Sequence, residues 1–332
     1  MSSNSETGVQ GIHAVEQNST SWKDGVYRQR EELARMLREP LGLLADRCIS
    51  VWGERERLNA VLLAGFSSIP YCSHLYVLES NGRQISDNVG ITGIVPGHFG
   101  RNRAERPYMK ESMPAWGFLL SDAYVGLATH HPSLTALQVV VSGVGTRGYL
   151  GADFDLRGLP VTSALYSEPN DWRQVKGDPA IRSTLFQQSR TESPMDRNMS
   201  VALSILEELL TERGVFQCQI HFSSSQATIW TIDDPMRYRI FDHEVLSDPD
   251  ICLVYASCPY PGDAAIPKAD IVRILCAMQA LRTVDTTIYL RTASLNIMNG
   301  MVSLTFSCDG SHYMRYDEFL AKGPSFWTGM TG

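Results

Sequence analysis

The chain has 332 residues, of which 43% are hydrophobic and 20% are charged, and its formal net charge is −7. This length predicts two domains of about 150 residues each, and the composition is typical of a folded protein. The negative charge argues against broad electrostatic binding to nucleic acid or to an anionic membrane, because both need clustered positive charge.

Residues 1–22 are rich in Ser, Asn, Gly and Thr, and they predict a disordered tail without the basic and apolar segments of a secretory signal. No apolar run approaches the roughly 20 residues that span a bilayer. The seven cysteines are scattered and form no CxxC pair, which favours reduced, buried thiols and argues against a structural zinc site. We therefore expect a cytoplasmic protein that needs no metal or cofactor.

Residues 24–65 have the spacing of an amphipathic helix, because apolar residues recur three or four positions apart. The stripe consists of Leu33, Leu37, Leu41, Leu44, Cys48 and Val51. Pro40 lies inside this pattern, and a proline in a helix interior removes a hydrogen bond. The sequence therefore predicts a kink or two consecutive helices at Pro40.

From residue 73 the apolar period changes to two, which predicts strands. Residues 73–80 and 81–89 form a predicted hairpin, with Asn81–Gly82 as its turn. Residues 104–113 predict one or two helical turns. Three further strands are expected at residues 117–128, 133–143 and 147–156. The first domain is thus an α+β unit with one antiparallel sheet flanked by helices.

The second half predicts another α+β module with an antiparallel sheet. Residues 166–195 resemble a linker, and residues 196–332 form the predicted second domain. Its first helix is expected to begin with Asp196 as N-cap and to end at Gly214. Strands at residues 215–222 and 226–232, a helix at residues 266–283 and further strands follow.

Several residues of the first unit have the chemistry of a small-molecule site. Arg106 can grip a carboxylate while Tyr108 packs against the ligand. Asp122 and Tyr124 are two residues apart, so they would share one face of a strand. Asp153 lies among apolar neighbours and needs a partner. The alternative is that Arg106 and Asp122 pair only to hold the short helix against the sheet.

The segments "FGRNRAERPYMKESM", "GFLLSDAYVGLATHHPSLTALQVVV" and "GTRGYLGADFDLRGL" together resemble the Cache (PDC, PAS-like) family of sensor domains. The likeness lies in an "RP-aromatic" helix start, an "SD-x-Y" strand, a "P-x-hydrophobic-T" strand and a last strand ending in Asp, in that order. It covers residues 25–165, and it implies a ligand-binding sensor domain at residues 23–165 with a long N-terminal helix.

The resemblance also implies roles for individual residues. Arg106 would bind a ligand carboxylate, Tyr108 and Tyr124 would line the site, and Asp122 and Asp153 would take an ammonium or a hydroxyl. Arg101 and Arg103 have no counterpart in the pattern and are expected in solvent.

Two further features bear on the ligand and on the assembly. Met109 stands where amine-binding members carry a second aromatic, and Tyr108 stands where they often have Trp. The expected ligand is therefore a small polar molecule: an amino acid, an amine or a carboxylate. Residues 24–58 would form the surface of a homodimer, and a separate signalling partner is expected. The second domain has no assigned role, and the PAS or profilin sheet is one candidate for its fold.

Two alternatives remain open from the sequence. One is an enzyme with its site in the second domain around Cys308, Asp309 and His312, where a thiolate would need an activating neighbour. The other is a scaffolding protein with a degenerate pocket. The sequence contains no phosphate-binding loop and no nucleophile-elbow motif, so we expect no enzymatic activity.

Overall fold

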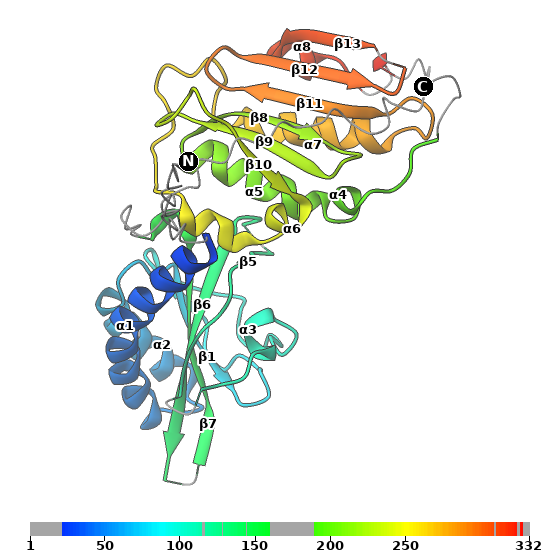
Figure 1. Cartoon of the computed structure of the whole chain (residues 1–332). Coiled ribbons are helices and arrows are strands. Elements are labelled where there is room, and N and C mark those ends of the chain that lie inside the picture. Colours follow the sequence, from blue (N-terminus) through cyan, green and yellow to red (C-terminus); the bar gives the residue numbers. More distant parts are fainter. Residues whose placement is uncertain are drawn as a thin grey trace, which may run out of the picture.

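The computed structural model describes residues 22–114, 117–127, 129–143, 145–159, 189–308, 310–323 and 326–327. The predicted tail before Trp22, the predicted linker up to residue 188, and Asp309 lie outside the described residues. The described chain forms two antiparallel sheets with helices packed against them, which confirms the α+β class (Figure 1). None of the described helices has the length and apolar character that crossing a membrane requires.

The first sheet has seven strands in the order β3-β2-β1-β7-β6-β4, and β5 also pairs with β6. Its strands are β1 (His74–Glu79), β2 (Asn88–Gly90), β3 (Gly93–Val95), β4 (Phe118–Leu120), β5 (Tyr124–Val125), β6 (Pro132–Ser142) and β7 (Gly145–Asp155). The predicted hairpin is present in part: β1 pairs with β2, but β2 begins only at Asn88, whereas the second strand was predicted over residues 81–89. The two long strands predicted later in the chain are present as β6 and β7. The last strand, β7, returns to the centre of the sheet between β1 and β6.

Helices cover the two faces of this sheet differently. The long helices α1 (Trp22–Ile49) and α2 (Arg55–Gly65) lie on one face, and the single turn α3 (Pro107–Lys110) lies on the other (Figure 1). Side chains alternate accordingly along β1: Leu75 and Val77 enter the main core, whereas Tyr76 and Leu78 belong to a separate cluster. The face beside α3 is therefore left with a small cluster of its own.

Of the two outcomes predicted at Pro40, two consecutive helices is wrong, and the kink stays a prediction. Helix α1 continues through Pro40 to Ile49, and the chain turns only at Gly53, which has a φ of 85°. Leu37 and Leu41, on either side of the proline, are fully buried. Their burial against the sheet offsets the hydrogen bond that the proline removes. The apolar stripe packs inside the chain, and a dimer through this helix would have to use other side chains, such as the exposed Tyr27.

The second sheet has six strands in the order β10-β9-β8-β11-β12-β13. They are β8 (Val215–His221), β9 (Gln226–Thr231), β10 (Arg239–Asp242), β11 (Leu290–Asn296), β12 (Met301–Phe306) and β13 (Ser311–Arg315). The surrounding helices are α4 (Pro194–Arg197), α5 (Met199–Glu212), α6 (His243–Leu246), the 3-10 helix η4 (Pro249–Val254), α7 (Asp270–Thr283) and α8 (Tyr316–Ala321). Here the strands after the central β11 run outward, so the two sheets differ in topology.

The start of the second unit also differs from the prediction. Asp196 is not an N-cap: Ser193 caps α4 with Asp196 as the third residue of a capping box, and Asn198 precedes α5. The Asp196 carboxylate instead binds the buried guanidinium of Arg282 through two hydrogen bonds of 2.8 and 2.9 Å. Gly214 follows the end of α5 with a φ of 72°, as predicted for a helix C-terminus.

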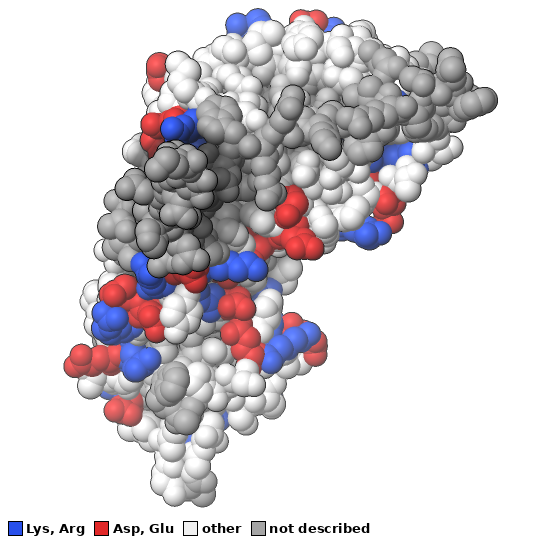
Figure 2. Space-filling model, viewed as in Figure 1, with Lys and Arg blue, Asp and Glu red and all other residues white. Residues whose placement is uncertain are grey.

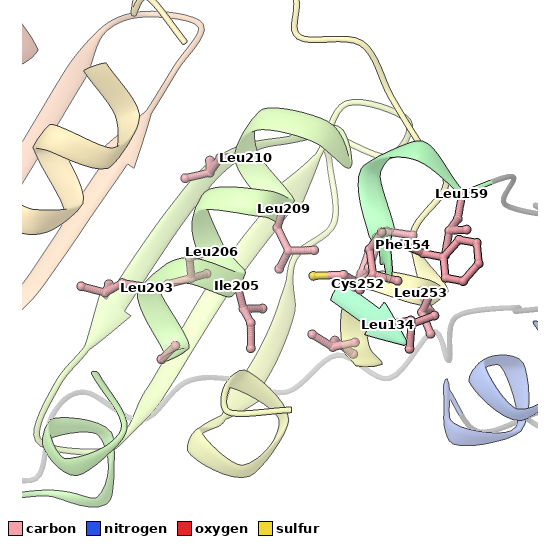
Figure 3. Close-up of a cluster of buried hydrophobic side chains, with 14 of the residues drawn as sticks. Leu134, Phe154, Leu159, Leu203, Ile205, Leu206, Leu209, Leu210, Cys252 and Leu253 are labelled. Carbon is pink, nitrogen blue, oxygen red and sulfur yellow. The ribbon is translucent and has the colours of Figure 1, made fainter. Parts of the chain in front are cut away.

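One hydrophobic core connects the two sheets. Phe154 and Leu134 of the first sheet lie beside Cys252 and Leu253 of η4, and Leu209 of α5 completes the contact (Figure 3). All five side chains are 4% exposed or less. The described parts of residues 22–159 (the first unit) and of residues 189–327 (the second unit) therefore meet through a packed apolar junction.

Candidate functional site

A small cluster of aromatic and polar residues lies on the face of the first sheet that α1 and α2 do not cover. Its buried members are Tyr76, Leu78, Tyr108, Leu119, Tyr124 and Leu137, and its partly buried members are Met109, Met113 and Tyr149. Three of the buried side chains are tyrosines, so hydroxyl groups lie inside an otherwise apolar cluster. Buried hydroxyls need hydrogen-bond partners, and those partners define the site.

Tyr76 occupies the centre of the cluster because β7 carries a glycine opposite it. Tyr76 and Gly151 are direct partners across β1 and β7. A Cβ atom at position 151 would come within 2.3 Å of the tyrosine ring. The glycine therefore lets the ring lie flat against the sheet, where its hydroxyl reaches the next residues of the same face.

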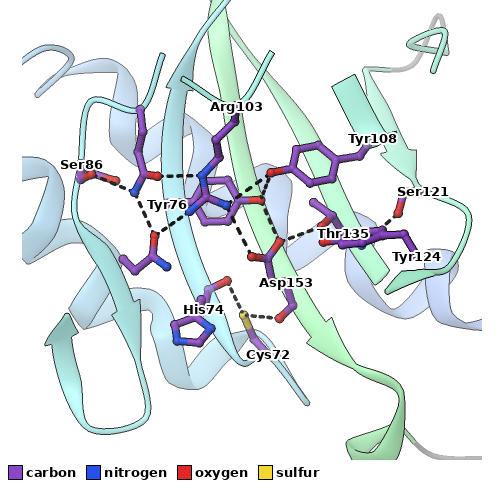
Figure 4. A network of polar contacts seen from close by, with 12 residues as sticks. Cys72, His74, Tyr76, Ser86, Arg103, Tyr108, Ser121, Tyr124, Thr135 and Asp153 are labelled. Atoms are coloured by element: carbon purple, nitrogen blue, oxygen red, sulfur yellow. Dashed lines mark hydrogen bonds and ion pairs between the residues drawn. The ribbon is translucent and has the colours of Figure 1, made fainter. Parts of the chain in front are cut away.

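Asp153 gathers the hydroxyl groups of the cluster (Figure 4). Its Oδ1 accepts hydrogen bonds from the Tyr76 hydroxyl at 2.8 Å and from Thr135 Oγ1 at 2.7 Å. The Tyr124 hydroxyl lies 2.7 Å from Thr135 Oγ1, so it extends the same chain of hydrogen bonds. Oδ2 has Arg103 Nη1 at 3.7 Å, beyond hydrogen-bond distance, and the side chain is 23% exposed. One carboxylate oxygen can thus accept a further donor from outside.

The sequence predicted Arg103 in solvent, and this prediction is wrong: Arg103 supports the network. Its guanidinium lies 3.8 Å from the Tyr76 ring centroid and its side chain is only 12% exposed. It donates to Gln84 Oε1 at 2.8 Å, to Asn88 Oδ1 at 3.0 Å and to the Tyr108 hydroxyl at 3.3 Å. Five donors in a fixed plane suit such a multiple contact. Arg103 therefore orders the tyrosines and the Asp153 carboxylate from one side.

Arg106 has a different environment. Its guanidinium lies 5.3 Å from the Tyr124 ring centroid and 6.0 Å from that of Tyr108. In the described ranges no carboxylate oxygen lies within 4 Å of it, so the alternative that it pairs with Asp122 is wrong. A cation held over two aromatic rings without a carboxylate partner retains its capacity to bind an anion.

Asp122 lies apart from the cluster. Asp122 and Tyr124 were predicted to share one face of a strand. This is wrong, because β4 ends at Leu120 and β5 begins only at Tyr124. The Asp122 side chain is 78% exposed and forms an ion pair of 2.8 Å with Arg30 of α1. Of the five predicted site residues, the structure thus brings Arg106, Tyr108, Tyr124 and Asp153 together and places Asp122 elsewhere.

Burial and charge perturb the tyrosine hydroxyls of the cluster. Burial, followed by the negative charge of Asp153, raises the pKa of Tyr76 well above its usual value. The same two causes raise the pKa of Tyr124. Both hydroxyls therefore stay protonated: Tyr76 donates directly to the Asp153 carboxylate, and Tyr124 binds Thr135, which donates to the same carboxylate oxygen.

The sequence analysis did not single out Tyr76, Thr135, Gln84 or Asn88 as members of the network, and it placed Arg103 in solvent. Tyr76 sits between Leu75 and Val77 in an apolar strand, so the alternation alone suggested only a second, more polar face. Thr135 lies directly across from Asp153 in the β6–β7 pair, a register that no residue pattern revealed. The available signal was the glycine two residues before Asp153.

The alternative site in the second unit contains an exposed thiol and a histidine whose ring packs against aromatic side chains. Cys308 is exposed at the end of β12, and His312 lies on β13. The His312 ring packs edge-on against Phe306 at 5.9 Å and Trp327 at 5.2 Å. Asp309 lies outside the described residues, and the enzyme hypothesis stays a prediction. Within the part of the chain that is described, no three His, Cys, Asp or Glu side chains are grouped to hold a metal ion.

No model of a known protein family matches the chain, and no curated protein matches it. Solved structures similar to part of it include the ligand-binding domain of the Pseudomonas fluorescens chemoreceptor CtaA in complex with L-isoleucine, with 16% identity and a TM-score of 0.30. The sensory domain of the Campylobacter jejuni chemoreceptor Tlp3 with isoleucine bound has 14% identity and a TM-score of 0.33. An extracellular ligand binding receptor from Desulfohalobium retbaense has 12% identity and a TM-score of 0.32.

The aligned regions cover 40% to 41% of this chain. They span 24% of the Desulfohalobium receptor, 53% of the CtaA domain and 55% of the Tlp3 domain. By name, these three neighbours are a receptor, a ligand-binding domain and a sensory domain, and the chain aligns with 55% of their length or less.

Proposed function

We propose that this protein is a small-molecule sensor, and that the cluster beside α3 binds a small polar ligand bearing a carboxylate, an ammonium group or both. The observation that carries the proposal is the arrangement of opposite charges on one face of the first sheet. Arg106 has no carboxylate partner in the described ranges, and Asp153 Oδ2 accepts no hydrogen bond from the residues described. The Arg106 guanidinium lies near the rings of Tyr108 and Tyr124, and Tyr124 is linked to Asp153 through Thr135.

The two charges fit complementary parts of such a ligand. A guanidinium binds a carboxylate through charge-assisted hydrogen bonds, and an aspartate oxygen accepts from an ammonium or a hydroxyl. The neighbouring tyrosines and the partly buried Met109 provide apolar surface for the ligand body. An amino acid would satisfy both charges, whereas a simple amine or carboxylate would satisfy one. In agreement with the sequence resemblance, the proposed fold type is a Cache-like sensor domain.

The proposed output is a change in the contacts that the protein makes with a second copy or with a signalling partner. A cytoplasmic location is the prediction made from composition and cysteine content. The assignment of residues 23–165 as the sensor domain and of residues 196–332 as a second domain is part of the same proposal.

A thermal-shift and calorimetric screen tests the binding proposal. The probes are the twenty amino acids, putrescine, acetate and succinate, each against the full chain. A ligand at a hundredfold excess over its Kd stabilises the folded state by about 2.7 kcal/mol. Arg106→Ala should weaken binding of a carboxylate compound at least about tenfold, since a hydrogen bond to a charged group contributes about 1.5–3 kcal/mol.

The matched control is Arg101→Ala, which removes an exposed arginine of the preceding loop. It should leave the affinity unchanged. Asp153→Asn should weaken the binding of amines and amino acids but leave the binding of acetate unchanged. The proposal fails if no probe stabilises the wild type, or if Arg101→Ala and Arg106→Ala weaken binding equally.

A further inference from the structure

The strands that hold the cluster lead directly into the junction with the second unit. Tyr124 follows Ala123, whose backbone N–H donates to Asp250 Oδ1 of η4 at 3.2 Å. Asp153 lies three residues before Leu156, whose carbonyl oxygen accepts a hydrogen bond from Arg213 at the end of α5. The two cluster residues are thus one and three residues away from contacts with the second unit.

The polar partners in the second unit are buried and committed to these contacts. The Arg213 side chain is fully buried, and it also donates to Tyr255 O at 3.1 Å. The Glu208 side chain is also fully buried, and its Oε1 lies 3.3 Å from Arg213 Nη2. Asp250 is 14% exposed. A displacement of either strand end would remove one hydrogen bond from a buried or nearly buried charged group, Arg213 or Asp250, which is costly.

Helix α1 links the same two places. Arg30 Nη2 donates to Leu120 O at 3.0 Å and pairs with Asp122 at 2.8 Å, while its Nη1 lies 3.5 Å from Asp250. One guanidinium therefore touches the chain before Tyr124 and the helix η4 together. Figure 2 shows acidic and basic side chains gathered around this level of the molecule, where the lower and upper parts meet.

The apolar part of the junction makes these contacts mechanically coupled. Phe154, between Asp153 and Asp155 on β7, packs on the opposite face of the sheet into the core shared with Cys252 and Leu253 (Figure 3). A packed interior resists gradual deformation and shifts between discrete arrangements. A movement of β7 at Asp153 would therefore displace the side chains of η4 and α5 that pack against it.

We propose that occupancy of the Arg106–Asp153 cluster is transmitted to the second unit through two strand-end contacts, Ala123–Asp250 and Leu156–Arg213. This inference rests on the proposed binding function, because it assigns the output of the same site. A ligand that pulls on Tyr124 or Asp153 changes the strand ends at which Asp250 and Arg213 bind, and it shifts the junction by its differential affinity for the two arrangements.

Hydrogen exchange of the full chain tests the coupling without a ligand. Tyr124→Phe keeps the ring but removes the hydroxyl that binds Thr135. We expect faster amide exchange in residues 249–254 and 208–213, by up to about fivefold, the factor that corresponds to a hydrogen bond contributing about 1 kcal/mol. The matched control is Tyr149→Phe, which removes a hydroxyl from the same sheet face four residues before Asp153.

The coupling is overturned if residues 249–254 exchange as in the wild type, or if Tyr149→Phe accelerates them equally. A second arm uses any probe of the ligand screen that binds: Asp250→Ala should change its affinity, because coupling between sites is reciprocal. If a probe binds and Asp250→Ala leaves its affinity unchanged, the transmission fails while the binding function stands. If Tyr124→Phe alters the junction and no probe binds, the coupling stands while the binding function fails.

Discussion

The buried Glu208 predicts a measurable pH dependence of stability. Its side chain lies on α5 and is fully buried, with Arg213 Nη2 at 3.3 Å and Arg157 Nε at 3.9 Å. Neither carboxylate oxygen accepts a hydrogen bond from the described residues. Burial raises the pKa of Glu208 to about 7, although the two arginines oppose the shift. The charged groups around it also include Asp155 of β7 and Glu212 of α5.

The sign and size of the effect follow from proton linkage. The pKa of Glu208 in the folded state exceeds the ordinary value of 4.5, so the folded chain binds a proton that the unfolded chain has lost. The difference between the folded pKa of about 7 and the ordinary value of 4.5 corresponds to about 3 kcal/mol. Below pH 4.5 Glu208 is protonated in both the folded and the unfolded chain, so it does not change the free energy of unfolding with pH there. Its ionisation lowers the free energy of unfolding progressively as the pH rises from 4.5 to about 7.

Glu208→Gln isolates this contribution, because glutamine resembles the neutral acid and does not titrate. The free energy of unfolding of the variant minus that of the wild type should rise by about 3 kcal/mol between pH 4.5 and about 8. Urea unfolding followed by tryptophan fluorescence measures both curves. A constant offset between them reflects the amide beside Arg213, and only the change with pH carries the prediction.

Glu105→Gln is the control of opposite sign. A hydrogen bond from Lys110 lowers the pKa of Glu105, which is fully exposed, so this variant should lose stability relative to the wild type as the pH rises. A difference between wild type and Glu208→Gln that varies by less than about 0.5 kcal/mol over the whole range would refute the reasoning.

Three further predictions concern the packing. Gly151→Ala should destabilise the fold by about 1–3 kcal/mol, because its Cβ would meet the Tyr76 ring at 2.3 Å, whereas Gly143→Ala, with no atom within 4 Å, should not; urea unfolding compares them. Asp196→Ala should destabilise the fold by about 3–5 kcal/mol, because it leaves the buried Arg282 guanidinium without its bidentate carboxylate partner; a loss below about 1 kcal/mol in the same assay would contradict this. Thiol labelling of the native protein should be fast at the two exposed cysteines and slow at the three buried ones until the chain unfolds; fast labelling of a buried thiol would contradict the packing. The exposed pair is Cys276 and Cys308, and the buried set is Cys48, Cys218 and Cys252.

Local pattern determined much of the architecture. The change of apolar period from three or four to two near residue 73 marks the passage from α2 to β1, because each period places side chains on one face of its own element. Gly214 was recognised as a helix end because glycine adopts positive φ without a steric penalty. Arg106, Tyr108, Tyr124 and Asp153 were singled out by residue chemistry and by their order along the chain.

Tertiary structure decided the features that depend on what faces a residue. Pro40 stays inside α1 because Leu37 and Leu41 gain burial against the sheet, an energy that the local sequence does not contain. Asp122 leaves the cluster because Arg30, 92 positions earlier, lies at the junction. Arg103 enters it because Tyr76 presents an aromatic face beside Asp153.

The division between the two has one physical reason. Periodicity, capping and turn chemistry act between residues a few positions apart, and the sequence displays them directly. The pairing of Asp153 with Thr135, and of Leu156 with Arg213, depends on strand register and on the packing of one unit against the other. The sequence by itself therefore determined most of the main elements and four residues of the cluster, while only the tertiary structure decided which groups meet and how the cluster connects to the second unit.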